Sequence, residues 1–320
     1  MSTSPPAKRQ RPDVEIIRSA IWHPDGSVVL QAGNTQFRVH WSVLALHSSF
    51  FRDMQGLPQP PDQPSVEGCP VVELTDVAED VTHVLRALYN PLFFARKAIS
   101  LPIIASHVRL GRKYDFTAIL HSVLERLTDE NPTSLDAYEA LKRGNGSYSA
   151  TRVLNSRGIY VDTVTLAREN NILSVLPCAY YRVLISSSPT QIFDGVDRGD
   201  GTVATLSAID QRRCSAGRAA ILRAQWDTGN TFGWIQETIP AEETGCIDVI
   251  ACRRKKASFF HRHVVKGSFL AFSSHIEHLK LCRVCSLDGE TKLTEGRKKM
   301  WELLPTFFEL PPWSELKDDL

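Results

Sequence analysis

Hydrophobic and polar positions near the start of the chain follow the two-residue period of β-strands. Residues 28–30 are a short β-branched and apolar run, and residues 36–39 alternate between polar and apolar side chains. Both patterns are typical of strands. Gly33-Asn34 lies between them, and both residues tolerate the positive φ of a tight turn. The sequence therefore predicts a β-hairpin.

Helical spacing takes over from residue 42. Ser42 can cap one short helix, and Ser48 or Ser49 can cap the next. A strand is predicted over residues 71–74, followed by a helix that Asp76 can cap. This helix and a later one each carry a single apolar stripe at i, i+3, i+4 and i+7, formed by Val81, Val84, Leu85 and Leu88 and by Leu120, Val123, Leu124 and Leu127.

These elements together predict an α+β protein in three parts. Residues 1–13 are polar and are expected to form a disordered tail. Residues 14–128 form a mixed domain with a small sheet and helices, and residues 129–320 form a mainly α-helical region with a flexible connection near 186–203. Further helices are expected near 101–114, 117–128, 204–225, 269–285 and 290–304.

The order of residues in the first part resembles the BTB/POZ domain. The fold-marking residues that carry this resemblance are Asp25, Phe37, His40, Leu44, Ser48, Phe51, Tyr89 and Tyr114. The resemblance implies a protein–protein interaction module that forms a homodimer, in which the first strand exchanges between subunits. Dimer contacts are then expected at Ile16, Ile17, Val43, Leu44 and His47. The helical region would present a surface to an unidentified protein partner.

Two further likenesses refine this interpretation. The segments 57–60 (LPQP), 68–70 (GCP) and 301–313 are similar to those of the BTB-containing proteins that are numerous in mushroom-forming (basidiomycete) fungi. Some BTB domains recruit a cullin for ubiquitin transfer, through an apolar residue two positions before an acidic one. Here Ser65 stands in the apolar place before Glu67, so a cullin-type ligase adaptor is kept as an alternative function.

His40 raises the question of catalysis or metal binding. No cysteine, acid or second histidine lies at a ligand spacing from it, and His47 falls on a different predicted turn. A lone histidine beside apolar residues is usually a hydrogen-bonded, partly buried structural residue. The resemblance gives His40 the same structural role at the start of a helix.

The strongest metal-ligand pattern lies near the C-terminal end. His275, His278, Cys282 and Cys285 combine imidazole and thiolate, which suit zinc, and Cys246 and Cys252 could complete the set. The alternative is an amphipathic helix in which the cysteines are small core residues. We expect no metal here, with this zinc set as the minority hypothesis.

A basic segment lies next to this pattern. Residues 249–276 contain no Asp or Glu but carry Arg253, Arg254, Lys255 and Lys256, with Phe259 and Phe260 among them. Basic and aromatic residues together are typical of single-stranded nucleic-acid binding. A zinc-dependent nucleic-acid-binding regulator using residues 246–285 is therefore a second alternative. The simpler interpretation is a solvated turn with both phenylalanines packed inward.

Composition limits the remaining classes. The 320 residues carry a formal charge of +1, with 42% hydrophobic and 23% charged residues, so nothing draws the whole chain to nucleic acid or to an acidic membrane. No apolar run is long enough to span a membrane. The seven cysteines are odd in number and scattered, and a chain of this size has little need of disulfides. They therefore indicate a reducing compartment, cytoplasmic or nuclear. Phosphate-binding loops and the GxSxG and HExxH motifs are absent, so we expect neither an enzyme nor a cofactor.

Overall fold

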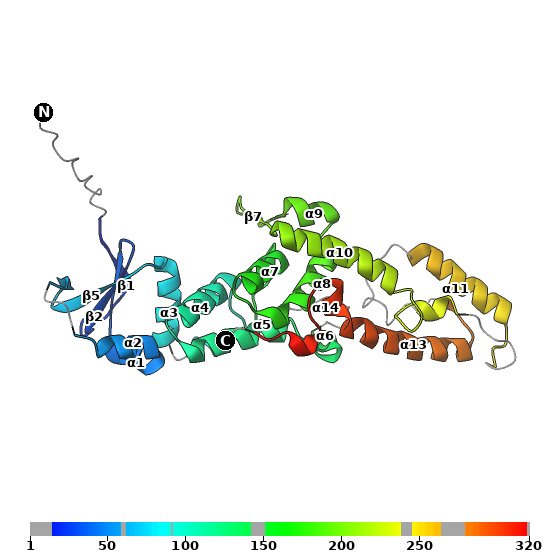
Figure 1. Ribbon diagram of the computed structural model, residues 1–320, viewed down its shortest axis with the longest axis horizontal. Helices are drawn as coiled ribbons and strands as arrows, with labels where there is room; N and C mark the ends of the chain where they lie inside the picture. The colour runs from blue at the N-terminus through cyan, green and yellow to red at the C-terminus, as the bar shows by residue number, and fades with distance from the viewer. Residues whose placement is uncertain are drawn as a thin grey trace, which may run out of the picture. The chain divides into compact units, whose positions relative to one another are not determined.

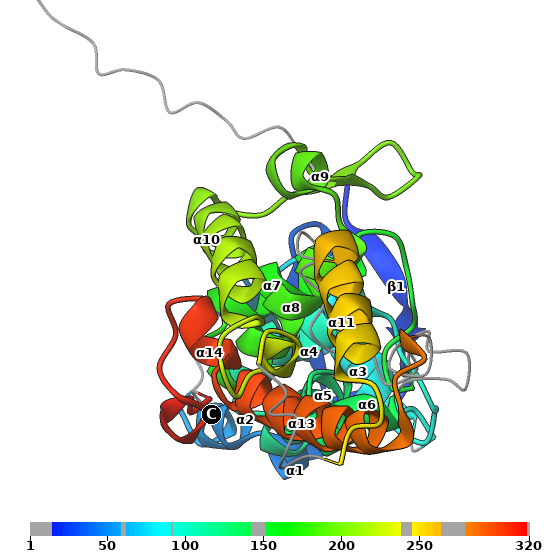
Figure 2. The same cartoon turned by 90° about the vertical axis from the view of Figure 1, so that its right-hand side faces the viewer.

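The computed structural model describes residues 15–58, 62–90, 92–141, 151–237, 245–263 and 279–318, with the side chains of 261–263 left out. The chain forms two compact units. The first comprises residues 1–96 and 102–123, and the second comprises residues 97–101 and 124–320. Figures 1 and 2 show the elements of both units, which are described separately below.

The first unit contains a five-stranded sheet in the order β1-β3-β2-β5-β4. Strands β2 (Val28–Ala32) and β3 (Thr35–Val39) form the predicted antiparallel hairpin, and Gly33 in its two-residue turn has a φ of 58°. Strand β1 (Ile17–Trp22) runs parallel to β3 at one edge. Strand β5 (Cys69–Leu74) runs parallel to β2 and carries the short β4 (Ser65–Val66) at the other edge.

Two short helices, α1 (Trp41–His47) and α2 (Ser49–Gln55), follow the hairpin and pack on each other. Ser48 caps α2 as predicted, since its Oγ accepts a hydrogen bond from the backbone N–H of Phe51 at 3.0 Å. The N-cap of α1 is His40 rather than Ser42, and it makes no side-chain cap bond.

Helix α3 (Ala78–Tyr89) follows strand β5 and packs against the sheet (Figure 1). The predicted stripe is confirmed in that Val81, Val84 and Leu85 are buried. The N-cap is Val77 rather than Asp76. Asp76 instead accepts hydrogen bonds from Lys113 and Tyr114, which join the start of α3 to the end of α4.

Helices α4 (Leu101–Lys113) and α5 (Thr117–Glu130) appear where the sequence predicted them. Gly111 in α4 allows a close approach to α5, because a Cβ at this position would lie 3.1 Å from that of Leu120. The core of the first unit is formed by residues of β2, β3 and α1–α5, including Val28, Leu30, Phe37, Val39, Leu44, Phe51, Leu85, Tyr114 and Phe116.

The second unit is built mainly from helices. Its first helices are α6 (Leu135–Ala140), α7 (Ile159–Glu169) and α8 (Leu176–Ser186), with the 3-10 helix η1 (Leu173–Val175) between α7 and α8. Helices α7 and α8 pack side by side. Tyr180 and Tyr181 of α8 are fully buried, and Tyr180 stacks on Phe308 at 5.1 Å.

The predicted connection at 186–203 has more structure than its composition indicated. It contains α9 (Pro189–Asp194), whose N-terminus is fixed by a capping box between Ser188 and Gln191, and most of a hairpin of β6 (Val196–Asp197) and β7 (Val203–Ala204). The SSSP segment, which indicated flexibility, contains this cap. Serine favours both loops and helix N-termini, so its presence alone does not distinguish the two.

The remaining helices are α10 (Ala208–Ala224), η2 (Gly233–Ile235), α11 (Val249–His263), α13 (Arg283–Glu302), α14 (Leu304–Phe307) and η3 (Trp313–Glu315). Helices α11 and α13 both contact η2. The helix predicted over 269–285 falls mostly outside the described residues, and α13 begins only after Cys282. Trp301 near the end of α13 donates to the carbonyl of Thr133 at 2.7 Å and stacks on Trp313.

Among the described residues, no helix combines the length and the apolar character needed to cross a membrane.

Candidate functional site

Helix α1 separates its side chains into an inner and an outer face. Trp41 and Leu44 point into the core and are 8% and 0% exposed. Val43, Leu46 and His47 follow the spacing i, i+3, i+4 and therefore share the opposite face. Leu46 is 74% exposed. This outer face of α1 places an apolar side chain in solvent although the inner face already supplies the core.

Two of the expected contact residues lie on or next to β1. Ile16 and Ile17 are 47% and 53% exposed. Among the strands that the structure describes, β1 lies at the edge of the sheet and pairs only with β3. An edge strand offers unpaired N–H and C=O groups to another chain.

Leu44 differs from the other residues expected at a dimer contact. It is fully buried in the core of its own unit and so stabilises the fold rather than forming a surface. Helix α1 has seven residues, which make only two turns. Trp41 is buried, and Leu44 lies three residues later and therefore on the same inner face. The exposed apolar side chains in this region are instead Leu46 and Phe50, the latter 40% exposed in the first turn of α2.

His40 belongs to a hydrogen-bonded group of side chains. Its Nδ1 lies 3.0 Å from the Tyr89 hydroxyl, and its Nε2 lies 3.2 Å from a carboxylate oxygen of Asp25. The Tyr89 oxygen also accepts the backbone N–H of His40 at 2.9 Å, and the Tyr89 ring stacks on His23. Burial raises the pKa of Tyr89. Both ring nitrogens of His40 therefore have partners in the chain itself, which ties the turn at Asp25 to the end of α3.

The other fold-marking residues act in the same structural way. Phe37 is fully buried, and Phe51 stacks on Tyr114 at 5.2 Å. The Ser48 hydroxyl donates to the backbone carbonyl of Tyr114 at 2.5 Å. Burial, with a contribution from the hydrogen bond to Asp76, raises the pKa of Tyr114 far above its usual range. This tyrosine is therefore a neutral hydrogen-bond donor at physiological pH.

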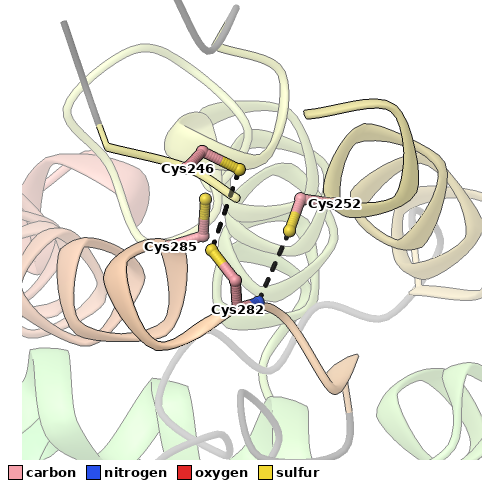
Figure 3. Close-up of side chains that lie close together, drawn as sticks. All are labelled: Cys246, Cys252, Cys282 and Cys285. Carbon is pink, nitrogen blue, oxygen red and sulfur yellow. Dashed lines mark hydrogen bonds between the residues drawn. The ribbon is translucent and has the colours of Figure 1, made fainter. Parts of the chain in front are cut away.

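Four cysteines of the second unit converge on one point (Figure 3). The Sγ atoms of Cys246, Cys252, Cys282 and Cys285 all lie within 4.8 Å of one another. Cys246 precedes α11, Cys252 ends its first turn, Cys282 is the N-cap of α13, and Cys285 lies in the first turn of α13. The Sγ atoms of Cys246 and Cys282 are 3.7 Å apart, and all four thiols are free.

Local hydrogen bonds and burial shift the pKa values of these thiols in different directions. The backbone N–H of Cys285 is the main cause that lowers the pKa of the Cys282 thiol to about 6. Burial raises the pKa of Cys252 and of Cys285. The backbone N–H of Cys282 donates to the Cys252 Sγ at 3.4 Å. The start of α13 thus supplies donors to sulfur, as a helix N-terminus favours negative charge.

The structure brings together all four cysteines of the metal set that the sequence offered as the minority hypothesis. Cys282 and Cys285 lie together, and the two cysteines that join them are Cys246 and Cys252. His275 and His278 lie outside the described residues. The sequence pointed first to the CxxC pair because its members are close in the chain, and it offered Cys246 and Cys252 as residues that could complete the set. The structure brings both of them to the pair.

The basic segment of α11 has two kinds of residue. Arg253 and Arg254 are exposed. Lys256 is 4% exposed, and its Nζ donates to the carbonyl of Trp234 at 3.0 Å. Phe259 is buried, and Phe260 packs edge-on against the Trp226 ring at 4.8 Å. These two rings contribute to the core, as the simpler interpretation predicted, but the segment forms helix α11 rather than the predicted turn.

Polar groups also meet around Glu130 and Arg182, which line a pocket of the second unit together with Tyr160. One carboxylate oxygen of Glu130 accepts the backbone N–H groups of Thr151 at 2.6 Å and Val153 at 3.2 Å. This arrangement fixes a chain segment against α5. Holding backbone amides is a structural task, so the group gives no positive indication of catalysis.

Comparison with known proteins places the first unit in a family. A family model of the BTB/POZ domain matches residues 26–129, which run from the turn before β2 to the end of α5. The comparison with curated proteins found no match. Neither result bears on the resemblance to proteins of mushroom-forming fungi. The chain therefore contains an N-terminal BTB/POZ domain, with a small sheet and helices, followed by a mainly helical C-terminal region.

Proposed function

We propose that this protein is a non-catalytic interaction module that homodimerises through its BTB/POZ domain. BTB domains are generally interaction modules, and they often dimerise or bind a cullin. The observation that carries the proposal is the outer face of α1, where Leu46 is 74% exposed beside Val43 and His47. A second copy would remove this apolar surface from water.

The edge strand β1 extends the same argument to the backbone. Ile16 and Ile17 are about half exposed, and one edge of β1 has no strand beside it among the described residues. Exchange or pairing of this strand between two copies would satisfy its free N–H and C=O groups. Stable homodimers commonly bury more than about 2,000 Å² with an apolar centre, so both elements are needed.

The C-terminal helical region would then bind a different protein. We place this activity in the cytoplasm or nucleus, because the cysteines of both units are free and BTB proteins are commonly found there.

The cullin-adaptor alternative depends on Glu67. Its two carboxylate oxygens bind Arg18 at 2.6 Å and Arg38 at 2.8 Å within the chain. These partly exposed ion pairs engage Glu67 within its own domain, and Ser65 stands where an apolar residue is expected, so the cullin adaptor is the second candidate function.

Light scattering of the full chain at low micromolar concentration tests the proposal. We expect a mass of about twice the 35.8 kDa chain. Leu46→Glu should raise the dissociation constant about tenfold or more, because it buries an unpaired carboxylate. The matched control is Leu92→Glu, since Leu92 is 72% exposed in the same unit but outside α1. A monomeric wild type, or equal effects of both variants, would contradict the proposal.

A further inference from the structure

We propose that Cys246, Cys252, Cys282 and Cys285 together bind one structural zinc ion. In a tetrahedral site each Zn–S bond is about 2.3 Å, which makes the edge between two sulfurs about 3.8 Å. The observed separation of the Cys246 and Cys282 sulfurs is 3.7 Å, and every pair in the set lies within 4.8 Å. The side chains are thus already arranged almost as a tetrahedral site requires.

The backbone around the cluster is suited to negative charge on sulfur. Helices α11 and α13 both begin at the cluster, and they are 15 and 20 residues long. Their N-termini carry partial positive charge, which favours thiolates. Figure 3 shows the backbone N–H of Cys282 directed at the sulfur of Cys252. Arg253 and Arg283 each follow a ligand directly in sequence and would offset the double negative charge of a zinc ion with four thiolates.

Other uses of four cysteines fit this geometry less well. A disulfide requires an S–S distance of about 2.05 Å, far below the 3.7 Å between Cys246 and Cys282. Calcium and magnesium require oxygen ligands, whereas four thiolates at tetrahedral spacing suit zinc, the usual ion of structural four-cysteine sites. Four protein ligands leave no open position for water, so the ion would have a structural role rather than a catalytic one.

The ion would hold together a part of the chain with little apolar core. We call residues 226–237, 245–263 and 279–296 the Cys-rich module. Its core is the cluster of Trp226, Phe232, Trp234, Ile235, Phe259, Leu279 and Leu293. The four ligands tie the start of α11 to the start of α13 beside this cluster. A small core commonly needs such a metal or a disulfide to become stable.

Elemental analysis of the full chain, purified under reducing conditions without chelator, tests the proposal. We expect one zinc ion per chain. Cys282→Ser should lower the zinc content about tenfold or more, because one thiolate ligand is lost. Cys69→Ser is the matched control: Cys69 is buried in the other unit and its thiol donates to the carbonyl of Gly26 at 3.0 Å, a bond that a serine hydroxyl can also make. The control should retain the full zinc content.

The histidines provide a second comparison. A variant with both His275→Ala and His278→Ala should keep its zinc, because the four cysteines complete the site. Loss of zinc from this variant would overturn the four-cysteine assignment. So would retention of zinc by Cys282→Ser, an iron ion in place of zinc, or a disulfide between Cys246 and Cys282 in the wild type.

A cobalt measurement keeps the test independent of how well the variants fold. The wild-type chain, stripped of metal and refolded with Co²⁺ under reducing conditions, should show thiolate-to-cobalt charge-transfer bands and the intense visible absorption of tetrahedral cobalt. Zinc added in equal amount should remove both. A spectrum without these bands, from a chain that has regained its helical circular dichroism, would contradict the proposal.

Discussion

The BTB/POZ domain and the Cys-rich module show two ways to stabilise a small part of a protein. Among the described residues, the main core of the first unit contains eighteen buried side chains, whereas the core of the Cys-rich module contains seven. The core side chains of the first unit come from a sheet, two short helices and three longer ones. The core side chains of the Cys-rich module lie between the charged helices α11 and α13 and the 3-10 helix η2. The free energy gained from burial grows with core size, so the smaller core depends more on other bonds.

The two parts also differ in their use of polar groups. In the BTB/POZ domain, polar side chains join elements that the core already orders, as Tyr89 joins His40 to the end of α3. In the Cys-rich module, four thiols lie where the apolar core ends, next to Leu281 and Val249. The polar contacts of the BTB/POZ domain add to a fold that its core already orders, whereas the four thiols themselves connect α11 to α13.

Removal of the metal should have the largest effect and should separate the two parts. The zinc-binding free energy of small structural sites is about 10–16 kcal/mol and is largely folding free energy. After treatment with a strong chelator under reducing conditions, backbone amides of α11 and of the first half of α13 should exchange rapidly in hydrogen-exchange mass spectrometry. Those of β2, β3 and α3 should keep their protection.

Added zinc should restore the protection of α11 and α13, which serves as the control for irreversible damage. Equal loss of protection in both parts would show that the proposed contrast between them is wrong. Unchanged protection in both parts would show that the cysteines act only as apolar core residues.

The sequence predicted the BTB/POZ domain well because its signals are local. The Gly33-Asn34 turn, the Ser48 cap and the apolar stripe of α3 each depend on residues within a few positions of one another. All four cysteines of the cluster were candidate ligands from the sequence, but tertiary packing decides which candidates meet, since Cys246 and Cys285 are distant in sequence. Leu44 was predicted both as a fold-marking residue and as a dimer contact, and its full burial supports the first of these roles.

Mild acid should weaken the BTB/POZ domain through His107. This histidine is fully buried in α4, its Nδ1 donates to the carbonyl of Ile103 at 2.6 Å, and burial lowers its pKa from 6.5 to about 4. His83 lowers this pKa further, whereas Asp80 raises it. Below pH 6.5 the unfolded chain binds a proton that the folded chain does not. Stability should therefore fall between pH 6.5 and 4, by about 3 kcal/mol in all.

This loss of stability can be measured by urea unfolding at a series of pH values, with hydrogen exchange in peptides from the sheet as the signal. His107→Gln removes the titrating group but keeps a donor for Ile103, so its stability should depend less on pH in this range. His121→Gln, at an exposed position of α5, should behave like the wild type. Identical pH profiles for His107→Gln and the wild type would show that His107 does not control the acid sensitivity of the domain.

The smallest expected effect concerns the hydrogen bonds around His40, and it tests whether polar groups only refine this domain. Tyr89→Phe keeps the ring that stacks on His23 but removes the hydroxyl that accepts the backbone N–H of His40 and contacts its Nδ1. The loss should be about 1 kcal/mol, the usual net value of such a bond, and should appear as a lower urea midpoint with unchanged zinc content. Asp25→Ala, which removes the exposed partner on the other side of the His40 ring, should have a smaller effect because water can replace its carboxylate. If Tyr89→Phe unfolded the domain, the hydrogen bonds of His40 would be essential to the fold, and the contrast with the Cys-rich module would lose its basis.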